Sequence, residues 1–239
     1  MMRRLVFFAS CVALFGCSGD APNPVDPGQP ARIEWGEGDV IVAMGTSLTF
    51  GYGSGCRVLP PRVPCAGDSA YPTLLSADLR LPIVNLAQPR STTRDGLALL
   101  SETLLHDPVL VLLEYGANDL IRGVSVEDAR ANMQQIIERL HAEGSAVALI
   151  SALHPDMIER TPTGHRLQSM SEPLLDYHAM VVDLADQYQL PLVEYLFEGI
   201  WWNAQLMFDE LHPNGRGYLI MKENVLSSLR GFLAANEMI

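Results

Sequence analysis

Two kinds of hydrophobic pattern alternate along the chain from about residue 39 onward. Short apolar runs rich in Val, Ile and Leu are typical of buried strands, whereas longer segments with apolar residues three and four positions apart are typical of amphipathic helices. The runs that predict strands are residues 39–44, 82–87, 108–116, 146–153 and 190–195. The segments that predict helices are residues 69–79, 92–105, 125–144, 167–189 and 215–236.

This alternation predicts a parallel sheet, because successive parallel strands need a helical crossover, which is nearly always right-handed. The run at 108–116 is apolar, as expected for a strand that is covered on both faces. The sequence contains no internal repeat and no second composition regime. We therefore expect one domain over residues 39–239, a three-layer α/β/α sandwich of flavodoxin-like kind with about five parallel strands.

The first residues have the pattern of an export signal. Arg3 and Arg4 precede an apolar stretch at 5–16 that is short for a permanent membrane span. The stretch ends at Cys17 and resembles a bacterial lipoprotein signal, in which the cysteine is lipidated and becomes the new N-terminus. Because Phe15 is bulky for that pattern, a plain secretory signal remains the alternative.

Residues 17–38 are rich in Pro, Gly and Asp, so we expect a flexible tether between a signal peptide at 1–16 and the domain. In lipoproteins, Asp directly after the lipidated cysteine is linked to retention in the inner membrane, and here Ser18 follows Cys17. We therefore expect a lipoprotein on the periplasmic side of the outer membrane.

The net charge limits the kinds of partner that the chain can bind. The formal net charge of −12 argues against binding to nucleic acid, and against electrostatic docking on an anionic membrane surface.

Cys56 and Cys65 are close in sequence and, in an exported chain, are expected to form one disulfide. The loop between them contains no His, so we expect no metal site there.

Several polar residues follow the ends of predicted strands. Ser47, Asn118 and His154 each come after a different strand, and ligands of open parallel sheets bind beyond the carboxyl ends of the strands. A serine hydroxyl becomes a nucleophile when a base, usually a histidine held by a third group, removes its proton. His212 has Asp209 three residues before it, within reach of such a pairing.

Three segments together resemble the SGNH (GDSL-type) hydrolase family: "GTSLTFGYG" at 45–53, "YGAND" at 115–119 and "DELHP" at 209–213. The order of these segments and the distances between them suit that family. The resemblance extends from Asp39 to the C-terminus. The resemblance implies that Ser47 is the nucleophile, His212 the general base and Asp209 its orienting partner. It also implies an oxyanion hole made by the backbone of Ser47 and the side chain of Asn118.

Two positions depart from the family pattern. The residue before the serine is usually Asp, and here it is Thr46. An oxyanion-hole glycine is replaced by Arg90, whose backbone N–H remains available as a donor. The added positive charge favours a substrate that carries a carboxylate or phosphate.

Simpler roles exist for the same residues. Ser47 and Asn118 also suit a helix cap or a turn, and Asp209 also suits a cap of the final helix. We expect Thr46, His154 and Trp201 to contact substrate, although core packing is an equal alternative for the tryptophan. The remaining histidines are expected to be solvated, namely His106, His141, His165 and His178.

The expected function is hydrolysis of a carboxylic ester or thioester through an acyl-enzyme, as in an esterase, thioesterase or lysophospholipase. This chemistry needs no metal or organic cofactor. The substrate is expected to be a small-molecule or lipid ester, while the oligomeric state is left open. The alternatives are an O-acetyl esterase acting on envelope polysaccharide and a non-catalytic envelope lipoprotein that binds a glycan or protein.

Overall fold

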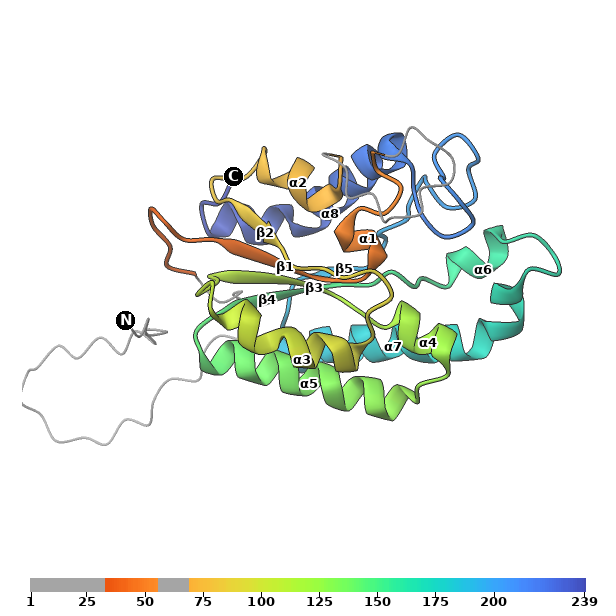
Figure 1. Cartoon of the computed structure of the whole chain (residues 1–239), viewed down its shortest axis with the longest axis horizontal. Helices are drawn as coiled ribbons and strands as arrows, with labels where there is room; N and C mark the ends of the chain where they lie inside the picture. The colour runs from red at the N-terminus through yellow and green to blue at the C-terminus, as the bar shows by residue number, and fades with distance from the viewer. Residues whose placement is uncertain (1–32, 56–68) are drawn as a thin grey trace, which may run out of the picture.

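The computed structural model describes residues 33–55 and 69–239, and it contains a five-stranded parallel sheet with strand order β2-β1-β3-β4-β5 (Figure 1). The strands are β1 (Ile41–Gly45), β2 (Ile83–Asn85), β3 (Leu110–Glu114), β4 (Ala146–Ile150) and β5 (Leu192–Val193). This is the strand order of flavodoxin-like proteins. The predicted fold class is thereby confirmed.

Helices cover both faces of the sheet. In Figure 1 the upper layer holds α1 (Ser47–Phe50), α2 (Tyr71–Ser76) and α8 (Gly215–Ala235). The lower layer holds α3 (Thr93–Leu104), α5 (Val126–Ala142) and α7 (Ser171–Tyr188).

Alternate residues of the central strands supply the two cores. Ile41 and Leu110 face the layer that contains α8, whereas Val42 and Val111 face α5 and α7. All four side chains are fully buried. This period of two, with apolar residues on both faces, explains why the predicted strands were continuous hydrophobic runs.

The order in which strands are added to the sheet reverses at β1, which pairs with β2 on one side and with β3 on the other. The register of β1 and β3 places Gly45 opposite Glu114 at the carboxyl end of the sheet. In doubly wound sheets this reversal of strand order opens a crevice for ligands. The segments that follow β1 and β3 therefore meet where a site is expected.

The segment predicted as helical at 167–189 begins as the 3₁₀ helix η1 (Arg166–Met170) and continues as α7. Three short helices were not predicted, namely α1, α4 (Ala117–Arg122) and α6 (Asp156–Arg160). None is long enough to show a helical hydrophobic period. The strands are also shorter than the runs that predicted them, most clearly at β5, because the ends of these runs belong to the connecting loops.

Residues 33–38, which we assigned to the tether, pack against the end of α8. The backbone N–H of Ile33 donates to Asn236 Oδ1, and the Trp35 indole donates to the Asn236 carbonyl at 2.7 Å. The packed structure therefore begins before Asp39. The signal peptide, Cys17 and the Cys56–Cys65 pair lie outside the described residues. Across 33–55 and 69–239, no helix has the length and apolar character needed to cross a bilayer.

Candidate active site

Ser47 lies at a sharp turn between strand β1 and helix α1. Thr46 is the N-cap of this helix and Ser47 is its first residue, so the backbone N–H of Ser47 has no partner within the helix. A Cβ atom at Gly45 would lie 2.4 Å from Thr49 Oγ1, a separation that only glycine avoids. The glycine therefore allows α1 to begin directly at the end of the strand.

His212 contacts Ser47 on one side and Asp209 on the other. Ser47 Oγ lies 2.8 Å from His212 Nε2, and His212 Nδ1 lies 2.9 Å from each carboxylate oxygen of Asp209. A proton on Nδ1 satisfies Asp209 and leaves Nε2 free to accept from the serine. The three predicted residues therefore form a continuous hydrogen-bonded chain.

Asp209 also shapes the loop that carries His212. Its Oδ1 accepts the backbone N–H groups of Leu211 and His212, both at 2.8 Å. Burial raises the pKa of Asp209, but the hydrogen bonds from His212 and Leu211 outweigh this effect and lower the pKa below its ordinary value. The helix α8 is capped by Asn214 instead, whose Oδ1 accepts from Arg216 and Gly217.

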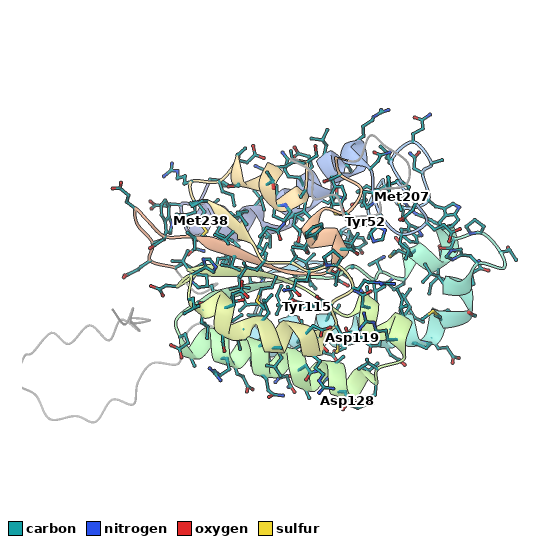
Figure 2. The ribbon with its side chains drawn as sticks, in the orientation of Figure 1. Tyr52, Tyr115, Asp119, Asp128, Met207 and Met238 are labelled. Carbon is teal, nitrogen blue, oxygen red and sulfur yellow. The ribbon has the colours of Figure 1, made fainter. Side chains whose placement is uncertain are left out.

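Close packing holds this loop against the segment after α1. Gly53 has a φ of 87°, and a Cβ there would lie 2.8 Å from the carbonyl oxygen of Pro213. The rings of Tyr52 and His212 are 4.6 Å apart, and Met207 pairs with Pro213 in an antiparallel bridge. Figure 2 labels Tyr52 and Met207 near each other in the layer above the sheet.

Thr46 contacts a buried carboxylate that we did not identify from the sequence. Its backbone N–H and its hydroxyl donate to Glu114 Oε2 at 2.9 and 2.8 Å, and Thr49 Oγ1 donates to the same oxygen at 2.9 Å. Burial raises the pKa of Glu114 to about 7, although these hydrogen bonds act in the opposite direction. Thr46 borders the cavity but is only 2% exposed. We therefore assign its side chain to supporting the turn, in place of the predicted contact with substrate.

Asn118 follows β3 and faces the loop after β2. Its Nδ2 donates to the Ser91 carbonyl at 2.8 Å, which uses one of its two amide hydrogens. The neighbouring Asp119 accepts both the backbone N–H and the hydroxyl of Thr93, the latter at 2.7 Å. Figure 2 labels Asp119 at the inner side of the lower helical layer. These bonds join the two loops that were predicted to share the active edge.

Arg90 occupies a left-handed backbone conformation, with a φ of 73°. This conformation explains why glycine suits the position, since a side chain is strained there. The Arg122 guanidinium donates to the Arg90 carbonyl at 2.6 Å. The exposed Arg90 side chain borders the same cavity as Ser47 and Asn118.

A cavity of about 560 Å³ opens over these residues. Ser47, Arg90, Asn118 and His212 lie on its wall, and the rest is mainly apolar, formed by Leu153, Met157, Leu167, Phe197, Trp201 and Leu211. The Trp201 indole donates to Met157 O and Thr161 Oγ1, which fixes the ring in place. Trp201 therefore lines the cavity as predicted.

His154 does not line the cavity, so its predicted position in the pocket is wrong. The two residues before it, Ala152 and Leu153, border the cavity instead. The imidazole of His154 instead faces His178 and Glu194.

The chain is similar in sequence to known proteins. Residues 43–220 match the model of the GDSL-like Lipase/Acylhydrolase family. Thioesterase 1/protease 1/lysophospholipase L1 of Escherichia coli K12 is 26% identical over 180 residues, which cover 74% of this chain and 76% of that protein. An arylesterase of Vibrio mimicus is 27% identical over 180 residues, covering 72% and 79% of the two chains.

Solved structures share the fold. A crystal structure of TesA aligns with a TM-score of 0.65 at 23% identity, covering 82% of this chain and 100% of that one. An acetylxylan esterase from Geobacillus stearothermophilus aligns with a TM-score of 0.62 at 18% identity, covering 82% and 95%. The family match spans most of the chain, so the chain belongs to the GDSL-like lipase/acylhydrolase family and is an enzyme that hydrolyses ester bonds.

Proposed function

We propose that Ser47 is the nucleophile of this hydrolase, with His212 as general base and Asp209 as the residue that orients it. The observation that carries this proposal is the 2.8 Å separation between Ser47 Oγ and His212 Nε2 at the wall of the cavity. A base at this distance can take the hydroxyl proton as the oxygen attacks a carbonyl carbon.

The reaction proceeds in two halves. Ser47 Oγ bonds to the substrate carbonyl carbon while its proton moves to His212 Nε2, and the resulting imidazolium is stabilised by Asp209. Collapse of the tetrahedral intermediate breaks the bond to the alcohol or thiol, which leaves with the proton from His212. Water then repeats the sequence on the acyl-enzyme, releases the acid and restores the Ser47 hydroxyl.

The oxyanion that forms in each half needs hydrogen-bond donors. We assign this role to the backbone N–H of Ser47, the second amide hydrogen of Asn118 and the backbone N–H of Arg90. The three residues border one cavity and come from the segments after β1, β3 and β2. A donor from each of three segments can surround one oxygen.

The substrate class that the cavity favours is an ester or thioester with an acyl or aryl group larger than acetyl. Its wall is mainly apolar, and its volume suits a small organic group. The relatives named as a thioesterase/lysophospholipase and an arylesterase support the same choice. The competing proposal is an O-acetyl esterase that acts on polysaccharide, since the fold is shared with an acetylxylan esterase.

A series of p-nitrophenyl and thioester substrates of increasing acyl length tests the proposal. We expect kcat/KM to rise from acetyl to longer chains, and a rapid burst of p-nitrophenol to precede steady turnover. Ser47→Ala, which retains the cavity, should lose both. A preference for acetyl alone would favour the O-acetyl esterase, and turnover in Ser47→Ala would refute the assigned nucleophile.

We further propose that Cys17 is lipidated and anchors the enzyme to the periplasmic side of the outer membrane, with Cys56 and Cys65 joined in a disulfide. The sequence pattern around Cys17 and the spacing of the cysteine pair support this proposal. Labelling with an alkyne fatty acid and membrane fractionation, wild type against Cys17→Ser, tests the anchor. Thiol alkylation with and without a reductant tests the disulfide.

A further inference from the structure

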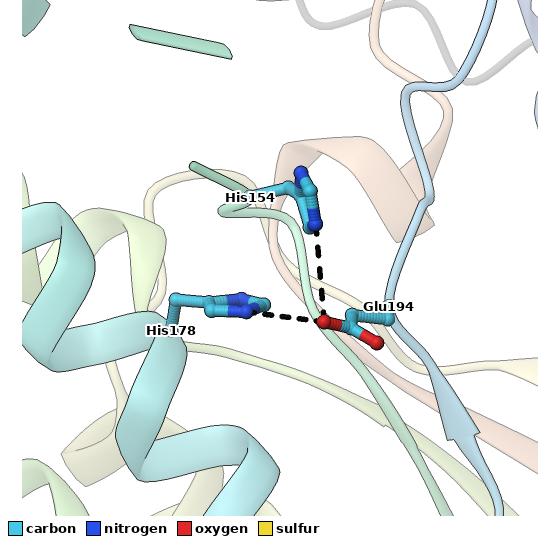
Figure 3. A group of neighbouring side chains, drawn as sticks. All are labelled: His154, His178 and Glu194. Atoms are coloured by element: carbon cyan, nitrogen blue, oxygen red, sulfur yellow. Dashed lines mark ion pairs between the residues drawn. The ribbon is translucent and has the colours of Figure 1, made fainter. Parts of the chain in front are cut away.

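His154, His178 and Glu194 form a compact cluster outside the catalytic cavity (Figure 3). His154 follows β4, His178 lies on α7, and Glu194 comes directly after β5. Their ligand atoms all lie within 4.8 Å of one another, and all three residues are partly buried. We had expected His178 to be solvated, which is wrong, because the fold brings together three residues that are far apart in sequence.

The proton on His178 is fixed by its backbone contact. His178 Nδ1 lies 2.9 Å from the Leu153 carbonyl oxygen, which can only accept, so Nδ1 carries a hydrogen. In the neutral ring, Nε2 then presents a lone pair towards Glu194 Oε1, 3.2 Å away. Two acceptors at this distance repel each other unless a positive charge, either a second proton or a metal ion, lies between them.

The cluster has the geometry of a site for a small divalent cation. Zinc bonds of about 2.0–2.2 Å place neighbouring ligand atoms of a tetrahedron roughly 3.3–3.6 Å apart. Glu194 Oε1 lies 3.2 Å from His178 Nε2 and 3.8 Å from His154 Nε2. Small shifts of the side chains are enough to bring all three atoms to bonding distance.

Both histidines also have an acceptor for their other ring nitrogen, as metal-ligating histidines almost always do. The Leu153 carbonyl serves His178. For His154, the Asp156 carboxylate lies 3.6 Å from Nδ1. In the structure, His154 Nδ1 accepts the Asp156 backbone N–H at 3.2 Å, so metal binding at Nε2 would move the ring proton to Nδ1 and towards that carboxylate.

We propose that His154, His178 and Glu194 bind Zn²⁺ through His154 Nε2, His178 Nε2 and Glu194 Oε1, with water as a fourth ligand. Two imidazoles and one carboxylate suit Zn²⁺ better than Ca²⁺ or Mg²⁺, which prefer all-oxygen ligands. The ion supplies the positive charge between Glu194 and the histidine lone pairs.

The site is linked to the catalytic cavity through Leu153. This residue lines the cavity, its carbonyl accepts from His178, and it directly precedes His154. Zn²⁺ would therefore hold the segment after β4 and one wall of the cavity in place. Given the proposed function, we expect the metal to sharpen acyl-chain preference while the ester chemistry proceeds without it.

Isothermal titration of untagged, chelator-treated full-length protein with Zn²⁺ tests the proposal. We expect one ion per chain and a higher melting temperature in its presence. His178→Gln and Glu194→Gln should each weaken binding by about tenfold or more, since each alters a ligand and loss of an outer-shell partner alone costs about that much. The control His106→Gln, at an exposed histidine elsewhere, should bind as wild type does.

Absence of one-to-one binding in the wild type would overturn the proposal and leave the cluster as a proton-bridged ion pair. Equal affinity in wild type and His178→Gln would overturn it as well. Ser47→Ala should retain full Zn²⁺ binding, so failure of the metal site and failure of the proposed nucleophile give different results.

Discussion

Thr46 Oγ1 lies 2.8 Å from Glu114 Oε2, although the two residues are 68 positions apart. The residue before the nucleophile is usually an acid in this family, and the departure at Thr46 suggested that a charge was missing. The structure places a carboxylate beside this residue, from the end of the neighbouring strand β3. The turn that carries Ser47 is therefore held by a buried glutamate.

The stability of the fold should depend on the ionisation of Glu114. Its pKa is about 7 in the folded chain, against an ordinary value of 4.5, because of burial. A raised carboxyl pKa contributes stability that is complete below about pH 4.5 and is lost as the pH rises through 7. This loss amounts to about 3 kcal/mol in the free energy of unfolding. Urea denaturation between about pH 4.5 and 8.5 should show this slope in the wild type, whereas Glu114→Gln should lack it.

Glu143→Gln is the matched control, since this glutamate is exposed at the end of α5. Its stability profile should follow that of the wild type. Parallel profiles for wild type and Glu114→Gln would show that Glu114 does not titrate in this range.

Asp209→Asn should reduce kcat by about 10³- to 10⁴-fold while the protein remains folded. The asparagine oxygen can still accept from the backbones of Leu211 and His212, so the loop is expected to hold. Its amide nitrogen, however, would face His212 Nδ1 as a donor and favour the tautomer in which Nε2 cannot accept from Ser47. Steady-state kinetics and melting temperature check this prediction.

The neighbouring Glu210→Gln provides a control at an exposed position. It should have kcat close to that of the wild type. If Asp209→Asn retained activity within about threefold of the wild type, Asp209 would not be the orienting residue.

Asn118→Ala should lower kcat by about 10²- to 10³-fold with little change in KM, because an oxyanion donor acts mainly in the transition state. Asn132→Ala is the matched control. Asn132 donates to Thr93 Oγ1, in the same region as the Ser91 contact of Asn118, but it does not border the cavity. Similar kinetic losses in both variants would indicate that Asn118 only supports the loop.

Arg90 can be tested for charge and backbone strain with two substitutions. Arg90→Ala and Arg90→Gly both remove the guanidinium, and each should reduce kcat/KM for anionic esters more than for neutral esters. Only Arg90→Gly relieves the left-handed backbone, so it should be more stable than Arg90→Ala by about 1 kcal/mol. An equal kinetic effect on both ester types would contradict a role for the charge in substrate selection.

The fold was predictable from the sequence because its strands are buried on both faces. The run at 108–116 needs no partner to be recognised as a strand, and the helix at 125–144 shows both its cap and its period. The helices α1, α4 and α6 were not predictable in this way, since four to six residues make too few turns for a period to appear.

The contacts around the site were predictable only in part. The residue types and their order along the chain predicted that Ser47, Asp209 and His212 act together. In the structure these three residues are in hydrogen-bond contact. Glu114 went unnoticed because a single acid at the end of an apolar run gives no sign of its burial. The partnership of His178 with His154 depends on how α7 packs against the segment after β4, which no local pattern encodes.

The proposed reaction depends on Ser47 as its nucleophile. The most direct measurement is labelling of the folded enzyme with a fluorophosphonate probe, followed by peptide mass spectrometry of the wild type and of Ser47→Ala. We expect one stoichiometric adduct on Ser47 and none in the variant. An adduct on another serine, or an unlabelled wild-type enzyme that still hydrolyses esters, would show that Ser47 is not the nucleophile.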